Sequence, residues 1–192
     1  MTKAEARKHY LEERQSLNDA ERNVLNWQIY NRFFAAGYLD LIKTVHIFLS
    51  IERTHEPDTW QLIDRIRREF PHIRLVVPRI NSHGTLDNFY FEGLHQLKQN
   101  SFGILEPAQG IPANTNKIDM VIVPLAAVDV EGNRVGYGKG YYDKFLKECR
   151  PDCLKVGLSF FEPAEKFADV EDHDVPLDVC FTPTKIFKFT ES

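Results

Sequence analysis

The residues best suited to chemistry lie close together in the segment 134–143, which reads Arg-Val-Gly-Tyr-Gly-Lys-Gly-Tyr-Tyr-Asp. Its glycines alternate with larger residues, and a backbone without Cβ atoms lets amide groups approach an anion closely. Arg134 and Lys139 add positive charge, and a helix beginning near Tyr141 would direct its positive end at the same place. The segment therefore predicts a polyphosphate-binding loop built on Gly136, Gly138 and Gly140.

This glycine-rich loop matches neither of the two commonest phosphate-binding motifs. The P-loop has four residues between its first glycine and a Gly-Lys pair, followed by Ser or Thr. Here five residues separate Gly132 from Gly138, and Gly140 follows Lys139. The dinucleotide fingerprint spaces its last glycines by two residues and follows the first strand. A glycine-rich turn packed over aromatic residues is the structural alternative, but glycines combined with Arg, Lys, Tyr and Asp favour a binding site.

Short apolar runs and helical periodicity predict the elements that must position this loop. Helices are expected over 2–15, from a cap at Ser16 and Asp19 to Gly37, between Pro57 and Pro71, and over 141–149. Strands are expected over 44–50, 74–77 (closed by Pro78), 88–91, 118–123, 155–159 and 179–181.

The alternation of these elements predicts the fold class. We expect one α/β domain over 1–192, with an N-terminal helical segment at about 2–37. It should be a Rossmann-like three-layer sandwich, in which helices cover both faces of a mainly parallel sheet. Ligands of such sheets bind outside the carboxyl ends of the strands. The loops that follow Ser50, Val77, Val123 and Ser159 should therefore form one functional edge.

Composition limits the classes of partner. Lys and Arg number 24 against 28 Asp and Glu, a net charge of −4, whereas proteins that neutralise many phosphates usually carry a basic surplus. The longest apolar run, 120–128, is much shorter than the ~20 residues of a membrane span. The charged residues 1–22 contain no apolar leader, and the three cysteines lack zinc-site spacing. We therefore expect no nucleic-acid partner, no membrane partner, reduced thiols and a cytoplasmic location. A monomer is favoured, although the sequence does not determine the oligomeric state.

The segment 134–143 resembles the signature of the 5-formyltetrahydrofolate cyclo-ligase family, also called methenyltetrahydrofolate synthetases. Four further segments are similar to that family in the same order along the chain, namely 3–7, 50–59, 77–79 and 173–178. One difference is Leu125, which stands where the family commonly has the glycine of Pro-Gly-x-Ala-Phe-Asp. The stretch 81–99 matches loosely, so no pterin contacts are assigned there.

The resemblance implies an ATP-dependent ring closure, in which 5-formyltetrahydrofolate becomes 5,10-methenyltetrahydrofolate through a phosphorylated formyl (iminium) intermediate. ADP and phosphate are released, with Mg²⁺ as the cofactor and ATP as co-substrate. The catalytic residues it implies are Lys139 and Arg134. The implied ATP-binding residues are Lys3, Arg7, Arg134, Gly136, Tyr137, Gly138, Lys139, Gly140, Tyr141 and Tyr142. The implied substrate-binding residues are Ile51, Glu56, Tyr137 and Tyr141, and the implied metal ligands are Asp143 and Asp174.

These assignments have structural alternatives. Lys3 and Arg7 lie one turn apart on a charged helix, a spacing also typical of a solvated helix face. Glu56 could interact with the start of the next helix, Asp143 could cap its own helix, and Asp174 lies in an acidic loop. For the whole chain, the alternatives are a non-catalytic nucleotide- or folate-binding module and an enzyme like the sugar-phosphate isomerases or CoA transferases.

Overall fold

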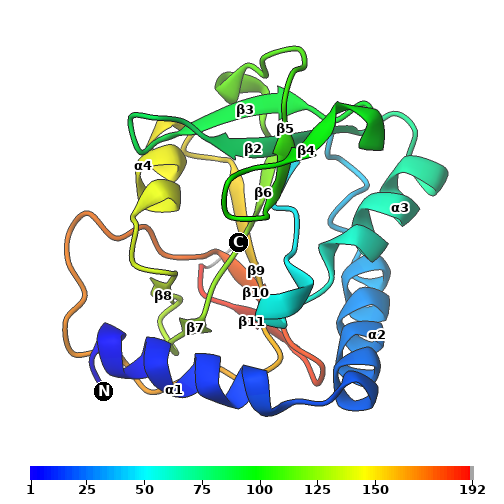
Figure 1. Ribbon diagram of the computed structural model, residues 1–192. Helices are drawn as coiled ribbons and strands as arrows, with labels where there is room; N and C mark the ends of the chain where they lie inside the picture. The colour runs from blue at the N-terminus through cyan, green and yellow to red at the C-terminus, as the bar shows by residue number, and fades with distance from the viewer. Residues whose placement is uncertain (191–192) are drawn as a thin grey trace.

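The central element of the fold is a seven-stranded sheet, found in a computed structural model that describes residues 1–190. The sheet has the order β11-β10-β9-β6-β1-β2-β3 (Figure 1). Its inner strands run parallel and its two edge strands run antiparallel to their neighbours. The parallel strands are β1 (Thr44–Ile47), β2 (Arg74–Ile80), β6 (Met120–Val123), β9 (Leu154–Leu158) and β10 (Val179–Phe181). The edge strands are β3 (Leu86–Tyr90) and β11 (Ile186–Lys188).

The order of the parallel strands indicates where a ligand can bind. Strands β1 and β6 are buried at every position, because they lie in the middle of the sheet with elements on both faces. In chain order the parallel strands are arranged 2-1-3-4-5, so the winding reverses between β1 and β6. Sheets with this order open a crevice outside the carboxyl ends of the strands at the reversal. The crevice therefore lies beside the loops that follow Ile47 and Val123.

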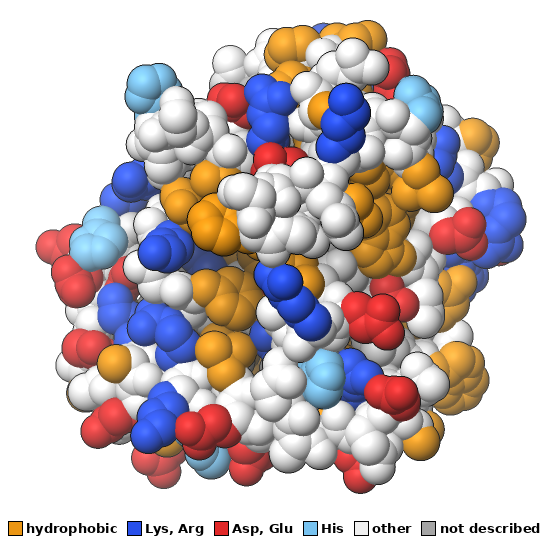
Figure 2. Space-filling view, viewed as in Figure 1, with side chains coloured by type: hydrophobic (Ala, Val, Ile, Leu, Met, Phe, Trp, Pro, Cys, Tyr) orange, Lys and Arg blue, Asp and Glu red, His pale blue; other side chains and the backbone are white. Residues whose placement is uncertain are grey.

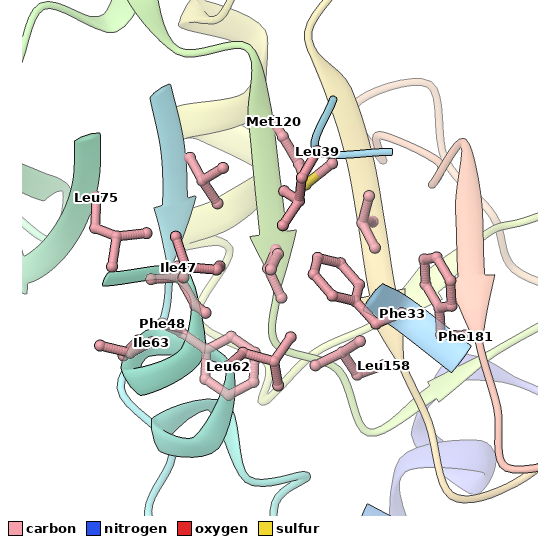
Figure 3. Close-up of a cluster of buried hydrophobic side chains, with 14 of the residues drawn as sticks. Phe33, Leu39, Ile47, Phe48, Leu62, Ile63, Leu75, Met120, Leu158 and Phe181 are labelled. Atoms are coloured by element: carbon pink, nitrogen blue, oxygen red, sulfur yellow. The ribbon is translucent and has the colours of Figure 1, made fainter. Parts of the chain in front are cut away.

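Helices cover both faces of this sheet, which confirms the predicted fold class. Helices α2 (Asp19–Ala35) and α3 (Thr59–Glu69) pack on one face, where Phe33 and Leu62 meet the apolar side chains of the strands (Figure 3). Helix α4 (Tyr141–Glu148) packs on the other face through Phe145. Helix α1 (Lys3–Ser16) packs through Ala6 against a small ribbon formed by β7 (Ala127–Val128) and β8 (Arg134–Val135).

Several predicted boundaries were wrong, and three of the differences have an identifiable physical cause. The second helix is capped by Asn18 rather than by Ser16 and Asp19, because the side chains of Asn18 and Glu21 exchange hydrogen bonds with each other's backbone amides. Strand β1 ends at Ile47 rather than at residue 50, since Ser50 instead exchanges hydrogen bonds with Thr59.

The third error concerns Pro78, which does not close β2. The strand continues through it to Ile80 and pairs there with β3. Strand β1 pairs only with Arg74–Val76, so Pro78 lies where β2 has a partner on one side alone. A residue without an amide hydrogen is tolerated at such a position.

Short elements at the edge of the site were not predicted. A hairpin of β4 (Leu97–Gln99) and β5 (Leu105–Pro107) extends toward the short 3₁₀ helix η1 (Glu52–Thr54), and Arg53 donates to the carbonyl of Phe102 at 2.8 Å. Two more 3₁₀ turns, η2 (Leu94–Gln96) and η3 (Thr115–Lys117), lie in the same part of the chain. No helix within 1–190 is both long and apolar enough to cross a membrane.

A fully buried histidine makes the stability of this fold depend on pH. His46 in β1 forms a 2.7 Å hydrogen bond with Asn88 through Nε2, while its Nδ1 has no partner in the described part of the chain. Burial lowers the pKa of His46 from 6.5 to about 4, against the opposing effect of Asn88. The folded protein therefore excludes a proton that the unfolded chain binds below pH 6.5.

The free energy of unfolding should consequently fall as the pH drops from 6.5 toward 4, with His46 contributing about 3 kcal/mol of that loss. Urea unfolding across this range, for the wild type and for His46→Leu, tests the prediction. The variant should lose less stability than the wild type over the same interval. An identical loss in both proteins would show that another group is responsible.

Candidate functional site

Three segments meet at the carboxyl ends of β1 and β6. One runs from Phe48 through η1 to Pro57, one leads from Pro124 through β7 and β8 to the glycine loop 136–140, and α1 lies across both. This face of the molecule is hollowed between α1, α4 and the β4–β5 hairpin (Figure 2). Hydrophobic side chains line the hollow, and Lys and Arg side chains gather on the side of α4, β7 and β8. The arrangement offers an apolar floor with positive charge at one end.

The glycine loop has the backbone geometry of an anion site. Gly138 and Gly140 have φ values of +90° and +72°, which side chains with a Cβ seldom adopt. Gly140 precedes α4, whose first amides have no side-chain cap, and the space above it is open. At Gly136 a Cβ would lie 2.6 Å from a guanidinium nitrogen of Arg134. Lys139 is exposed between these glycines and makes no hydrogen bond or ion pair within 1–190, so its ammonium is available to a ligand.

The two predicted cations of α1 reach this loop. Arg7 donates through Nε to the carbonyl of Gly136 at 2.8 Å. Lys3 donates through Nζ to Asp174 at 2.7 Å. Burial lowers the pKa of Lys3, but the hydrogen bond and charge of Asp174 outweigh it, and the pKa is raised overall. Both side chains are therefore tied to neighbouring loops, unlike those of a freely solvated helix face.

The predicted folate residues Ile51, Glu56 and Tyr137 lie together. One carboxylate oxygen of Glu56, Oε2, accepts the amide of Ile51 at 2.6 Å, and Oε1 accepts the hydroxyl of Tyr137 at 2.8 Å. The N-cap of α3 is Asp58, so Glu56 does not cap that helix, and its carboxylate bonds to Ile51 and Tyr137 instead. Burial raises the pKa of Glu56, whereas the two hydrogen bonds and the charge of Arg14 act in the opposite direction.

The remaining two tyrosines of the motif point to different places. The ring of Tyr141 lies beside Gly84 in the turn between β2 and β3. The ring of Tyr142 is 6.0 Å from the guanidinium of Arg134. Burial raises the pKa of Tyr142, and the charge of Glu56 adds to this effect. Tyr142 therefore lies within electrostatic reach of Glu56 and Arg134, while Tyr141 lines the edge nearest the β2–β3 turn.

Arg134 is buried beneath the glycine loop rather than projecting from it. Its two terminal nitrogens donate to the carbonyl of Pro124 at 3.1 Å and to Asp143 at 3.3 Å. Its Nε is buried without a hydrogen-bond partner in the described residues. Arg134 thus joins the end of β6 to α4 and places a full positive charge under the loop.

The two predicted metal ligands lie on adjacent segments. Asp143 accepts the amide of Val175 at 3.1 Å through Oδ1, which brings the neighbouring Asp174 next to α4. Asp143 makes no capping hydrogen bond, because α4 begins at Gly140 without a side-chain cap. Burial raises the pKa of Asp174, but the hydrogen bonds from Lys3 and from the Glu171 amide, together with the charge of Lys3, outweigh it and the pKa is lowered overall.

Of these two carboxylates, Asp143 keeps an oxygen without a hydrogen bond from the described chain, whereas Oδ2 of Asp174 already accepts from Lys3 and from the amide of Glu171. Residues 1–190 contain no group of three or more His, Cys, Asp or Glu side chains placed to hold a metal. Mg²⁺ does not need such a group, since it commonly binds one or two carboxylates and takes its other ligands from phosphates and water. The Oδ2 atom of Asp143 accepts no hydrogen bond from the described chain, so it is available as a ligand.

Sequence reasoning missed two charged residues that organise the site. Arg14 is 4% exposed and donates to three different segments. The sequence feature that could have identified Arg14 is its spacing of seven residues from Arg7, which places both side chains on one face of α1. Asp129 is fully buried and accepts hydrogen bonds from Glu131, Asn133 and Phe167. It fixes the turn between β7 and β8.

The substitution of Leu125 for the usual glycine is accommodated in the core. Its side chain is 5% exposed and belongs to the apolar cluster beneath α4. Its Cδ2 atom lies 2.8 Å from the place that a Cβ of Gly157 would occupy. Because Gly157 has no Cβ, there is space for the Leu125 side chain. The backbone carbonyl of Leu125 faces the site, where it accepts a hydrogen bond from Arg14 at 3.2 Å.

Comparison with known proteins identifies one family. The family model described as the 5-formyltetrahydrofolate cyclo-ligase family matches residues 1–183. The 5-formyltetrahydrofolate cyclo-ligase of Escherichia coli K12 is 27% identical over 179 residues, covering 92% of this chain and 97% of the relative. The NMR structure of Aquifex aeolicus 5,10-methenyltetrahydrofolate synthetase has a TM-score of 0.85 at 29% identity, covering all of this chain and 95% of that one. The Mycoplasma pneumoniae 5,10-methenyltetrahydrofolate synthetase, at 24% identity and a TM-score of 0.76, shares the fold.

Proposed function

The chain belongs to the 5-formyltetrahydrofolate cyclo-ligase family, and we propose on this premise that it uses ATP to convert 5-formyltetrahydrofolate into 5,10-methenyltetrahydrofolate. The cyclo-ligase activity follows from the family match over residues 1–183, which is the observation that carries the assignment. ATP dependence is supported by the glycine loop, with its uncapped helix start and exposed Lys139 at the reversal of the sheet.

The reaction requires activation of a poor leaving group. The formyl oxygen attacks the γ-phosphate of ATP, ADP leaves, and a phosphorylated iminium forms. Nitrogen 10 then attacks the formyl carbon and releases its proton to solvent, and phosphate departs with the formyl oxygen as the five-membered ring closes. Such phosphoryl transfer asks a protein mainly for positioning and for neutralisation of charge.

The charged residues of the site are suited to these two tasks. The amides around Gly138 and Gly140 would hold the phosphates, and Lys139 would contact the transferred group. Arg7 and Arg134 support the loop from either side through Gly136 and Pro124. We propose that Lys3, Tyr137, Tyr141 and Tyr142 complete the ATP site, with Tyr137 and Tyr141 also facing the folate.

Glu56 is the proposed folate anchor. A pterin presents an amino group and a ring N–H on one edge, and a carboxylate can accept both. Each oxygen of Glu56 accepts one hydrogen bond from the protein and keeps a lone pair for a ligand. Glu56 and the glycine loop are joined by the bond from Tyr137, so the folate and the phosphates would lie side by side.

Mg²⁺ is the proposed cofactor, held by Asp143 and Asp174, and it would neutralise phosphate charge. Replacing either residue with asparagine should raise the Mg²⁺ concentration for half-maximal activity about tenfold, which corresponds to ~1.4 kcal/mol. Activity titrated against Mg²⁺ measures this effect. Asp172→Asn is the matched control, because Asp172 is an exposed carboxylate of the same acidic loop. A variant of Asp143 or Asp174 with the metal dependence of the control would remove that residue from the site.

ADP release tests the proposed function against its alternatives. The enzyme should release ADP only when 5-formyltetrahydrofolate is present, in equal amount to the methenyl product. A nucleotide- or folate-binding module would release none, and an isomerase would act on a sugar phosphate without ATP. We further propose a cytoplasmic protein with one domain over 1–192 that acts on these small molecules, with a monomer favoured over an oligomer.

A further inference from the structure

Arg14 connects α1 to every loop of the proposed folate site. It is almost fully buried, and each of its hydrogen bonds goes to a different segment. Nε donates to the carbonyl of Thr54 at 2.9 Å, in the loop after β1. One terminal nitrogen donates to the carbonyl of Leu125 at 3.2 Å, in the loop after β6. The other donates to the hydroxyl of Tyr137 at 2.8 Å, in the glycine loop.

A second hydrogen bond connects Tyr137 to Glu56. The hydroxyl of Tyr137 accepts from Arg14 and donates its own proton to Oε1 of Glu56 at 2.8 Å. The amide of Ile51 holds the other carboxylate oxygen at 2.6 Å. The carboxylate is therefore fixed at both oxygens, and one of these contacts transmits the charge of a buried guanidinium. Chains of this kind polarise each hydrogen bond along them.

We propose that Arg14 and the hydroxyl of Tyr137 are positioning residues for the folate, holding the Glu56 carboxylate ionised and oriented toward the pterin. The inference rests on the proposed function, since it assumes that Glu56 receives the substrate. Neither residue transfers a proton or touches the reacting atoms in this role. Arg14 acts on Glu56 through Tyr137 and through its own charge, and its effect should therefore fall on folate binding.

The environment of Glu56 explains why such support is needed. Burial raises the pKa of this carboxyl group overall, and the opposing groups are the Ile51 amide, the Tyr137 hydroxyl, Arg14 and the Thr54 side chain. Tyr142 of α4 interacts electrostatically with this carboxylate, and the ring of the neighbouring His55 bonds to the carbonyl of Arg14. Among the groups that lower the pKa of Glu56, Arg14 is a permanently charged cation. Without Arg14 or the Tyr137 hydroxyl, more of the carboxyl group would be protonated at a given pH.

Two variants test this chain of hydrogen bonds from Arg14 through Tyr137 to Glu56, here called the relay, by independent routes. Tyr137→Phe keeps the ring and removes only the hydroxyl, while Arg14→Met keeps the chain length and removes the charge. Gln15→Ala is the matched control, because Gln15 also donates from α1 to the same loop, at the carbonyl of Arg53, and does not contact Tyr137 or Glu56. The steady-state parameters for both substrates are measured from pH 5 to 9 with full-length protein.

Each relay variant should raise KM for 5-formyltetrahydrofolate about tenfold. KM for ATP should change less than twofold, because Tyr137→Phe keeps the ring proposed to line the ATP site and removes only a hydroxyl that is already bonded to Arg14 and Glu56. The acid limb of kcat/KM for the folate should also move to higher pH, because Glu56 then needs a lower proton concentration to ionise. The Gln15→Ala control should show neither change.

A purely structural role predicts a different outcome. Both KM values would then rise together, or the melting temperature alone would fall, and the acid limb would stay in place. Either pattern overturns the relay. If Arg14→Met does not fold, Tyr137→Phe decides alone, since its hydroxyl lies at the edge of the site. A wild-type protein that forms no methenyl product refutes the proposed function itself, whereas an active wild type with an unaltered Tyr137→Phe variant refutes only the relay.

Discussion

Replacing Lys139 with methionine is expected to lower the turnover number by a factor on the order of 10² to 10³. Lys139 lies between Gly138 and Gly140, exposed and without an ionic partner in the described chain. The charge of Lys139 therefore contributes little to the stability of the fold. It is available to neutralise the negative charge that develops on the transferred phosphate. Methionine keeps an unbranched side chain and removes only this charge.

The measurement is kcat for Lys139→Met under saturating ATP and folate, compared with Lys144→Met. Lys144 is an exposed lysine in the first turn of α4 and controls for the loss of one positive charge close to the loop. The melting temperature of both variants should match the wild type. Near-normal turnover of folded Lys139→Met would mean that the loop amides suffice and that the role given to Lys139 is wrong.

Replacing Glu56 with glutamine is expected to lower kcat/KM for 5-formyltetrahydrofolate about 10- to 100-fold, because hydrogen bonds to a charged group contribute ~1.5–3 kcal/mol. The amide preserves the shape of the side chain and can still accept from Ile51. It lacks the charge, and it offers a donor where the pterin also offers donors. The loss should appear in KM for the folate.

Glu52→Gln is the matched control for this variant, since Glu52 is an exposed carboxylate in η1 of the same loop. Its kinetic parameters should equal those of the wild type. If Glu56→Gln binds the folate with unchanged KM, or if both KM values rise equally, Glu56 is a structural residue and the pterin lies elsewhere.

The strands and the placement of the site could be predicted from the sequence because their signals are local. The buried runs at 44–47 and 120–123 are continuous and apolar, as both faces of a central parallel strand require. The position of the glycine loop after the second of these runs then placed it at the carboxyl edge of the sheet. The proximity of Glu56 to the loop followed from the same rule.

The contacts within the site could not be predicted, because they depend on how α1 docks. Arg14 is separated from Leu125 and Tyr137 by more than a hundred residues, and its charge gives no sequence signal of burial. The bond between Lys3 and Asp174 is similarly remote along the chain. The strands β4, β5 and β11 were missed for another reason, since each is three residues long and partly exposed, whereas the equally short β10 is buried at every position.

The most direct test of the account is the absorbance of the methenyl product after the protein is mixed with 5-formyltetrahydrofolate. The product band should grow only when ATP and a divalent cation are present together, and ADP should accumulate in equal amount. Equal product without ATP would contradict the phosphorylated intermediate. Absence of product from folded protein in the complete mixture would contradict the assignment as a whole.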